Sequence, residues 1–279
     1  MLDLYTQTTL DCSKIITQHY STSFTLGIKT LASKYHGAIY SIYAYVRYAD
    51  EIVDTFHEHN KTELLSRFKE DTFVAIKEKI SLNPVLHSFQ LVVNQYNIDH
   101  SLIIAFLHSM EMDLAQQTFT EETYQEYIYG SAEVVGLMCL NVFCDGDVDE
   151  YQKLESSAKS LGAAFQKVNF LRDIKSDFDI RGRIYFPGVD FSNFSEKDKS
   201  IIESDIAKDF ENALFGIKNL PKGARGGVYL AYAYYLQLFK KIKKLPSTSI
   251  QLERIRVPDY VKMTLLAKTL FLDRLNYIA

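Results

Sequence analysis

Residues 43–59 of this chain read YAYVRYADEIVDTFHEH. The pattern is helical, yet Asp50 and Asp54 stand four positions apart and therefore share one face of the helix. Like charges at this spacing repel by roughly 0.2–0.5 kcal/mol unless a cation compensates. Arg47 and Tyr43 extend the same face in a segment that is otherwise apolar. Because the burial of unpaired carboxylates is costly, this stripe must face something polar.

A second stretch, residues 161–187, repeats the pattern in LGAAFQKVNFLRDIKSDFDIRGRIYFP. One helix face carries its polar residues, Gly162, Gln166, Asn169, Asp173 and Asp177. The residues between them are mostly apolar, and a solvated face would usually carry Lys or Glu in place of Gln and Asn. We therefore interpret the two stripes as facing acidic helices that hold divalent cations. Two solvated surfaces are the alternative interpretation.

Oxygen ligands of this kind, carboxylates with an amide, favour Mg²⁺, with Mn²⁺ also accepted. Mg²⁺ in proteins usually keeps several waters and is completed by substrate phosphates, so the pattern predicts a phosphate ester as ligand. A di-iron carboxylate centre is a rival, since Asp54 and His57 form one acid-x-x-His pair. The second stretch has Ser176 at the equivalent place and no nearby His.

The composition excludes several classes of protein. The 279 residues are 47% hydrophobic and 24% charged, which is typical of a globular chain with a large core. The net charge of −4 gives no basic field for nucleic acid. Three Cys without a CxxC pair suit a reducing compartment, the N-terminus lacks a basic leader, and no apolar run approaches the ~18 residues of a membrane span. We expect a cytoplasmic protein.

The distribution of proline and glycine along the chain predicts an all-α fold. Only 5 Pro and 12 Gly are present, and most stand at the edges of long periodic segments. Asn83 before Pro84 and Ser195 with Asp198 look like helix starts. The expected helices span residues 33–58, 62–80, 84–96, 100–117, 120–143, 148–178, 195–217, 224–245 and 249–277. No repeat or linker divides them, so we expect one domain over residues 1–279.

Five motifs resemble those of the squalene/phytoene synthase family, in the order and spacing of that family over roughly residues 19–187. They are SFTLGIKTL from Ser23, IYAYVRYADEIVD, SMEMDLAQQTF, YIYGSAEVVGLM, and LGAAFQKVNFLRDIKSDFDIRGRIYFP. The resemblance implies an isoprenoid synthase helical bundle around one central cavity. It also implies that two prenyl diphosphates are joined head to head through a cyclopropylcarbinyl diphosphate.

The resemblance assigns roles to individual residues. It implies Mg²⁺ ligation by Asp50, Asp54, Asp173, Asp177 and Asn169. It implies catalytic roles in the cavity for Arg47, Tyr129 and Tyr235. It implies substrate contacts from Ser21, Ser23, Phe24, Arg47, Gln166, Asn169, Arg172 and Arg183. Arg181 and Arg183 stand in a basic loop that would close over diphosphate, with a solvated turn as the alternative.

Within the family, the motifs look most like those of bacterial phytoene synthases, which favours two geranylgeranyl diphosphates. Dehydrosqualene or squalene synthesis from two farnesyl diphosphates is the alternative, and squalene would also need NADPH. A helical scaffold without activity is the non-enzyme alternative. We expect Ala132 and Gly136 to line the cavity, and Gly136→Phe to block the longer substrate. Residues 240–244, KKIKK, are a solvated helix end or contact the inner membrane face for product release.

Overall fold

The computed structural model describes residues 2–115, 118–179, 183–189, 194–250, 255–275 and 277–278, and the side chains of all of these except 176–179. Within these ranges every regular element is a helix, as predicted, and the single β-bridge joins Thr118 to Ile184. The helices are α1 Leu2–Tyr20, α2 Thr22–Thr30, α3 Ser33–Asp54, α4 Lys61–Glu78, α5 Pro84–Tyr96, α6 His100–Ala115, α7 Glu121–Ile128, the π-helix η1 Tyr129–Glu133, α8 Val134–Cys144, α9 Val148–Asp179, α10 Glu196–Asn219, α11 Lys222–Lys243, α12 Ser247–Ile250 and α13 Asp259–Arg274.

The two predicted helix starts are confirmed. The Asn83 side chain accepts hydrogen bonds from the backbone N–H groups of Val85 and Leu86, with Pro84 at the first helical position. Ser195 and Asp198 form a capping box at the start of α10. These side chains satisfy backbone donors that the first turn of a helix leaves without partners.

The two ends of the chain differ from the prediction. Helices α1 and α2 precede the first predicted helix, and Ser21 between them caps α2 by accepting from the N–H of Phe24 at 3.2 Å. At the other end, the single helix predicted over residues 249–277 is wrong. Residues 255–258 are not helical, and α13 begins after Pro258, because a proline disfavours the helical conformation of the residue before it.

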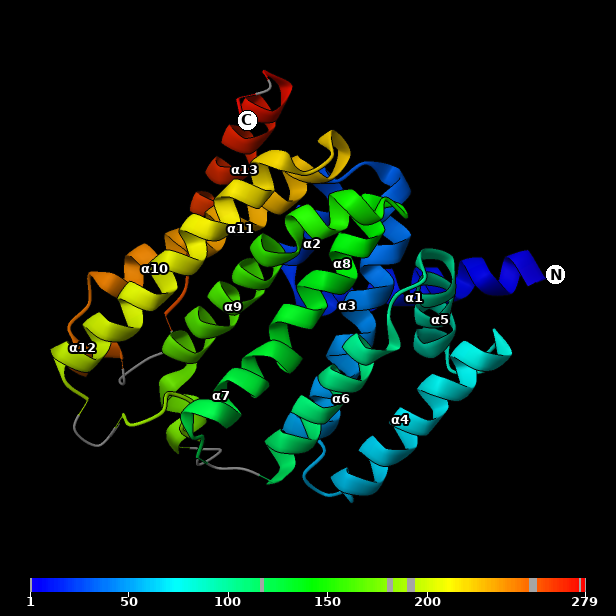
Figure 1. The fold of residues 1–279 in the computed structure, drawn as a ribbon, viewed down its shortest axis with the longest axis horizontal. Helices are drawn as coiled ribbons and strands as arrows, with labels where there is room; N and C mark the ends of the chain where they lie inside the picture. Colours follow the sequence, from blue (N-terminus) through cyan, green and yellow to red (C-terminus); the bar gives the residue numbers. More distant parts are fainter. Residues whose placement is uncertain are drawn as a thin grey trace.

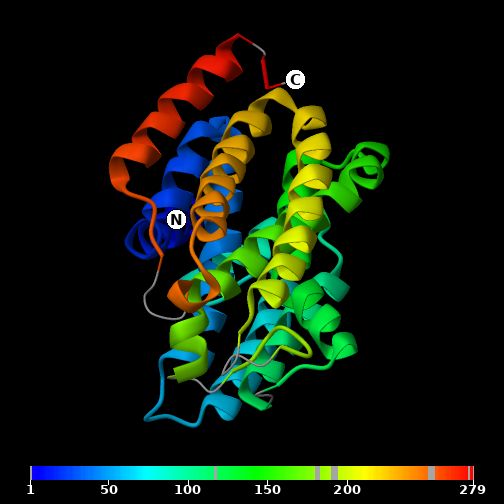
Figure 2. The ribbon, with the colours of Figure 1, turned by 90° about the vertical axis from the view of Figure 1, so that its left-hand side faces the viewer.

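The long helix α9 lies against both α8 and α10, and α3 packs on α1, α5 and α8 (Figure 1). One buried apolar cluster draws mainly on α3, α5, α6 and α8, and a second on α9, α10 and α11. Figure 2 shows α13 on the outer side of α11. Helix α13 contacts both α11 and α2. The single domain over residues 1–279 stays a prediction, which the contacts between early and late helices support.

Candidate active site

A cavity of about 510 Å³ lies between α2, α3, α8, α9, α10 and α11. Its lining changes from apolar to polar along α3 and along α9. On α3 it runs from Ile39 through Tyr43 to Asp50, and on α9 from Leu154 to Arg172. Helix α8 runs antiparallel to α9, so its last turn, with Phe143, lies near Leu154 of α9 at the apolar end of the cavity. The cavity therefore has an apolar end and a polar end.

On α3, the structure places Arg47 and Asp50 at the polar end of the cavity. The Arg47 guanidinium pairs with Glu51 and lies 3.9 Å from the Asp50 carboxylate. Burial raises the pKa of Asp50 to about 7; Arg47 opposes this rise, and the carboxylates of Asp54 and Asp113 add to it. Burial therefore disfavours the charged form of this carboxylate unless a cation lies close to it.

On α9, a chain of hydrogen bonds fixes the polar residues that face the cavity. Gln166 Nε2 donates to Ser131 Oγ at 3.3 Å, and Asn169 Nδ2 lies 3.5 Å from Gln166 Oε1. The Tyr235 hydroxyl donates to Asn169 Oδ1 at 3.2 Å, and its ring stacks on Phe165 with the centroids 3.9 Å apart. Gln166, Asn169 and Tyr235 therefore lie in the cavity, as the sequence predicted.

The second acidic pair is only partly described. Asp173 forms an ion pair with its neighbour Arg172, whose Nε lies 3.0 Å from Asp173 Oδ1. Arg172 itself lines the cavity. The side chain of Asp177 and all of Arg181 lie outside the described residues, so their predicted roles stay predictions.

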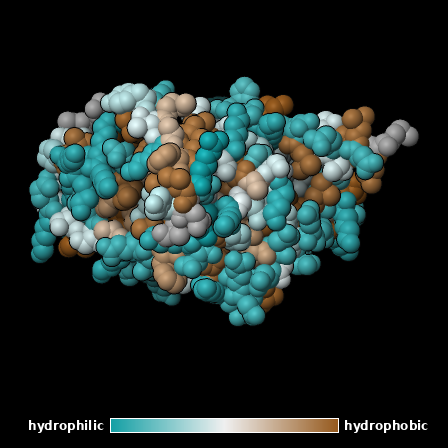
Figure 3. Space-filling model, turned by 90° about the horizontal axis from the view of Figure 1, so that it is seen from above, coloured by the Kyte–Doolittle hydropathy of each residue, from teal (hydrophilic) through white to brown (hydrophobic). Residues whose placement is uncertain are grey.

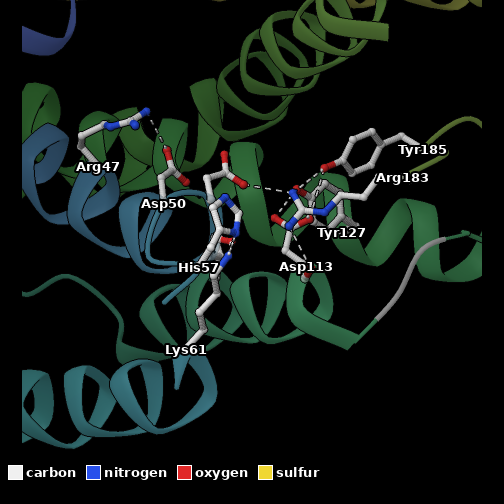
Figure 4. Close-up of polar contacts among 10 residues, drawn as sticks. Arg47, Asp50, His57, Lys61, Asp113, Tyr127, Arg183 and Tyr185 are labelled. Carbon is white, nitrogen blue, oxygen red and sulfur yellow. Dashed lines mark hydrogen bonds and ion pairs between the residues drawn. The ribbon is translucent and has the colours of Figure 1, made fainter. Parts of the chain in front are cut away.

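Figure 4 shows a buried network that the sequence analysis missed, centred on Asp113 of α6. The hydroxyls of Tyr127 and Tyr185 donate to its carboxylate at 2.8 and 3.2 Å. Arg183 Nη2 donates to the Asp113 carbonyl at 3.0 Å, and Arg183 Nη1 donates to Asp54 Oδ1 at 3.1 Å. Burial raises the pKa of Asp113 to about 6, although Arg183 and Tyr127 lower it. The signal was present as one acid between the apolar Met112 and Leu114 in the motif SMEMDLAQQTF.

Two predicted positions are corrected. Tyr127 lines the cavity, whereas Tyr129 does not; its ring faces Lys159, whose Nζ lies 5.8 Å from the ring centroid. Two residues along a helix correspond to about 200° of rotation, so both tyrosines cannot face the cavity. Ser23 lies outside the cavity, in a narrow seam beside α13, while Ser21 and Phe24 do line it.

Ala132 and Gly136 line the cavity as predicted. The expectation that Gly136→Phe would only block the cavity is wrong. A Cβ atom at Gly136 would lie 2.9 Å from the backbone oxygen of Ala158, so a side chain there would force α8 away from α9. The substitution would disturb packing before it filled the cavity.

The donor set fits Mg²⁺ in its chemistry. Within the described residues, no three His, Cys, Asp or Glu side chains are grouped closely enough to hold a metal. The predicted ligands Asp50, Asp54 and Asp173 each contact an arginine instead. Burial and the neighbouring carboxylates of Asp54 and Asp113 disfavour the charged form of Asp50, and a hard cation beside it would stabilise that form. The rival di-iron ligand His57 instead lies 3.0 Å from Lys61 Nζ (Figure 4).

One run of helix among the described residues, Glu121–Cys144, is long and apolar enough to cross a membrane by length and composition. The sequence analysis had found no such run. Of its most apolar window, 61% is buried inside the protein, as expected for a core helix.

Comparison with known proteins identifies the family. The squalene/phytoene synthase family model matches residues 17–260. A 4,4'-diapophytoene synthase from Staphylococcus haemolyticus (strain JCSC1435) is 26% identical over 204 residues, which are 71% of this chain and 68% of that protein. The phytoene synthase of Arthrospira platensis is 27% identical over 276 residues, 89% of this chain and 88% of its own length. A crystal structure of a dehydrosqualene synthase with a ligand aligns with a TM-score of 0.79 at 21% identity, over 95% of this chain and 96% of that chain, which shows the predicted isoprenoid synthase fold. The chain belongs to the squalene/phytoene synthase family of enzymes.

Proposed function

We propose that this enzyme joins two molecules of geranylgeranyl diphosphate head to head to form phytoene, through a cyclopropylcarbinyl diphosphate and with release of diphosphate. The observation that carries the proposal is the graded cavity, apolar at one end and charged at the other. A prenyl diphosphate has the same division, with a long apolar tail and a dianionic or trianionic head.

Arg47 and Arg172 line the polar end of the cavity and would bind diphosphate oxygens, since a guanidinium matches phosphate with two parallel hydrogen bonds. Asp50, Asp54, Asp173 and Asp177, with Asn169, would hold Mg²⁺. When bound, Mg²⁺ would neutralise the charge that develops on the leaving diphosphate. The buried arginines add to this stabilisation because they are oriented before the reaction starts.

The apolar wall of the cavity would protect the carbocation that remains after diphosphate leaves. It excludes water, which would otherwise trap the cation as an alcohol. Phe24, Phe165 and Tyr235 line the cavity near its polar end, and their aromatic rings would stabilise positive charge. Burial raises the pKa of Tyr43 to about 12, so its phenol stays neutral and does not react as a phenolate.

A second candidate is the condensation of two farnesyl diphosphates to dehydrosqualene. The observation that favours it is the similarity to a 4,4'-diapophytoene synthase, which matches this chain about as well as phytoene synthases do. The two reactions share the polar end of the cavity and differ by one isoprene unit in each tail. Their discrimination therefore depends on the apolar end.

The test incubates the purified enzyme with geranylgeranyl or farnesyl diphosphate and Mg²⁺, with and without NADPH, and identifies the hydrocarbon by mass spectrometry. We expect a forty-carbon hydrocarbon from geranylgeranyl diphosphate, no requirement for NADPH, and a higher kcat/KM than with farnesyl diphosphate. A higher kcat/KM for farnesyl diphosphate would establish the second candidate. Release of no diphosphate from either substrate would contradict both and favour a scaffold.

A further inference from the structure

The outward face of α13 is apolar. Tyr260, Met263, Leu270 and Phe271 are exposed by 74%, 56%, 44% and 64%, and Leu275 just after the helix by 48%. Their spacing of three, seven, one and four residues keeps them on one side of the helix. Seen from above, the upper face of the molecule carries apolar side chains among hydrophilic ones (Figure 3). Scattered exposed apolar residues are normal, but a row along one helix marks an interaction surface.

The inward face of the same helix combines polar residues with half-buried apolar ones, among them Val261 and Leu272, which pack against the core. Thr269 is only 1% exposed, and the Asp273 carboxylate lies so close to α11 that a Cβ at Gly226 would come within 2.9 Å of it. Lys262 also turns inward, with Nζ 5.7 Å from the centroid of the Tyr234 ring. A surface helix normally buries its apolar stripe and exposes its polar one. Helix α13 is instead apolar on both sides, so its outer face exposes apolar side chains that an ordinary surface helix would replace with polar ones.

The position of α13 links this face to the cavity. A narrow, mostly apolar seam runs between α2, α11 and α13, with Lys262 and Leu265 as its α13 wall. Phe24, Ala231 and Tyr235 line both this seam and the cavity. Helix α13 therefore covers one flank of the cavity and carries an exposed apolar surface on its other side.

Charge and area favour a lipid surface as the partner. Lys268 and Arg274 lie on the outward side among the apolar residues, while the exposed Asp259 at the helix start pairs with Lys262 at 3.0 Å. Lys241 donates to the carbonyl of Arg256 at 2.7 Å, which brings the basic end of α11 close to the start of α13. These cations would attract anionic headgroups and would repel a second copy of the same face.

The area argues against a protein partner of high stability. A helix of 16 residues is about 24 Å long, and its outer half presents roughly 240 Å² if about 10 Å wide. A stable protein interface needs about 800 Å² per partner. Shallow insertion of an amphipathic helix into a bilayer has no such requirement, since apolar side chains and basic residues at the headgroups suffice.

We propose that the outer face of α13 docks on an anionic phospholipid bilayer, with Met263 and Phe271 in the acyl region and Lys268 and Arg274 at the phosphates. Docking would turn the flank of the cavity that α13 covers toward the membrane. An apolar product could then pass into the bilayer, and this last step of the proposal rests on the proposed function. This surface differs from residues 240–244, where the sequence placed membrane contact.

The test is flotation with vesicles of phosphatidylcholine mixed with phosphatidylglycerol, in the absence of substrate. Wild type is expected to float with them, less at high salt and less with phosphatidylcholine alone. The double variant Met263→Ser/Phe271→Ser should partition about tenfold less, because two inserted side chains are lost. The matched control is Phe215→Ser on α10, a different helix, where the phenylalanine is 60% exposed, and this variant should float as wild type does.

Wild type that stays unbound to the anionic vesicles at low salt would overturn the proposal, as would an equal loss in Phe215→Ser. A dimer by light scattering that Phe271→Ser dissociates would show that a second copy covers the face instead. Diphosphate release from detergent-dispersed substrate is expected to be unchanged in the double variant. If the enzyme is active but does not bind vesicles, the docking proposal fails and the proposed function holds. If the enzyme binds vesicles but is inactive, the proposed function fails and the docking proposal holds.

Discussion

Asp50→Asn should stabilise the metal-free protein at alkaline pH while it removes activity. The pKa of the Asp50 carboxylate rises from 3.8 to about 7, first through burial and then through Asp54 and Asp113. In this pH window the folded state binds a proton that the unfolded chain has released. The free energy of unfolding therefore falls as the pH rises from about 4 to about 7, and an Asn at this position removes that dependence.

The magnitude follows from the width of the window. Between pH 5 and pH 7 the upper limit is about 2.7 kcal/mol, at 1.36 kcal/mol per pH unit. The Asp50 side chain is 36% exposed, and solvent screening reduces the effect to about 1 kcal/mol. For a protein of this size that corresponds to roughly 2–4 °C in Tm.

The assay is thermal unfolding in EDTA at pH 5 and pH 8, for wild type, Asp50→Asn and the control Asp71→Asn, which replaces an exposed carboxylate on α4. The Tm gain of Asp50→Asn over wild type should be larger at pH 8 than at pH 5, and the control should show no such difference. Turnover with Mg²⁺ should fall by on the order of 10²–10³. An Asp50→Asn protein less stable than wild type at pH 8 would refute the reasoning, as would near-normal turnover.

Three further predictions concern the cavity and its cation. Tyr127→Phe should lower kcat about tenfold because it removes a hydrogen bond to a buried carboxylate, whereas Tyr129→Phe should stay within about twofold in the same assay. Ala132→Phe should lower kcat/KM for geranylgeranyl diphosphate several-fold more than for farnesyl diphosphate, and an unchanged ratio would place the length limit elsewhere. EDTA should abolish turnover and Mg²⁺ or Mn²⁺ should restore it, so full activity in EDTA would contradict a metal mechanism.

The periodicity of the sequence was sufficient to predict which residues share a face of a helix. The stripe of Tyr43, Arg47 and Asp50 lines the cavity, and so does that of Gln166 and Asn169, because a regular helix fixes which residues share a side. Long helices with capping residues could be placed for the same reason. The helices before residue 33 could not be placed, since their apolar pattern is weak and they pack mainly on α3, α5 and α11, which come later in the chain.

The errors arose where local rules meet tertiary packing. Tyr127 and Tyr129 are both aromatic and differ only in rotation, and the π-helix Tyr129–Glu133 shifts the register between α7 and α8. Gly136 was expected to leave room for a larger side chain, but the absence of a Cβ atom there allows the backbone of α9 to pack closely. Asp113 became a candidate only once folding brought Arg183 to it from 70 residues away.

Each of the four described acids at the polar end already has an arginine partner. The pairs are Asp50 with Arg47, Asp54 and Asp113 with Arg183, and Asp173 with Arg172. A cation that takes over such a carboxylate weakens the pairing of a guanidinium that is 10–28% exposed, although Arg47 would keep Glu51 and Arg183 would keep one of its two acids, and a poorly paired, largely buried charge is costly. Diphosphate can accept hydrogen bonds from these arginines, so the exchange is most favourable when both ligands arrive. Mg²⁺ and inorganic diphosphate should therefore raise Tm together by more than the sum of their separate effects, since binding linkage is reciprocal. Additive shifts would show that the arginine pairs do not couple the two ligands.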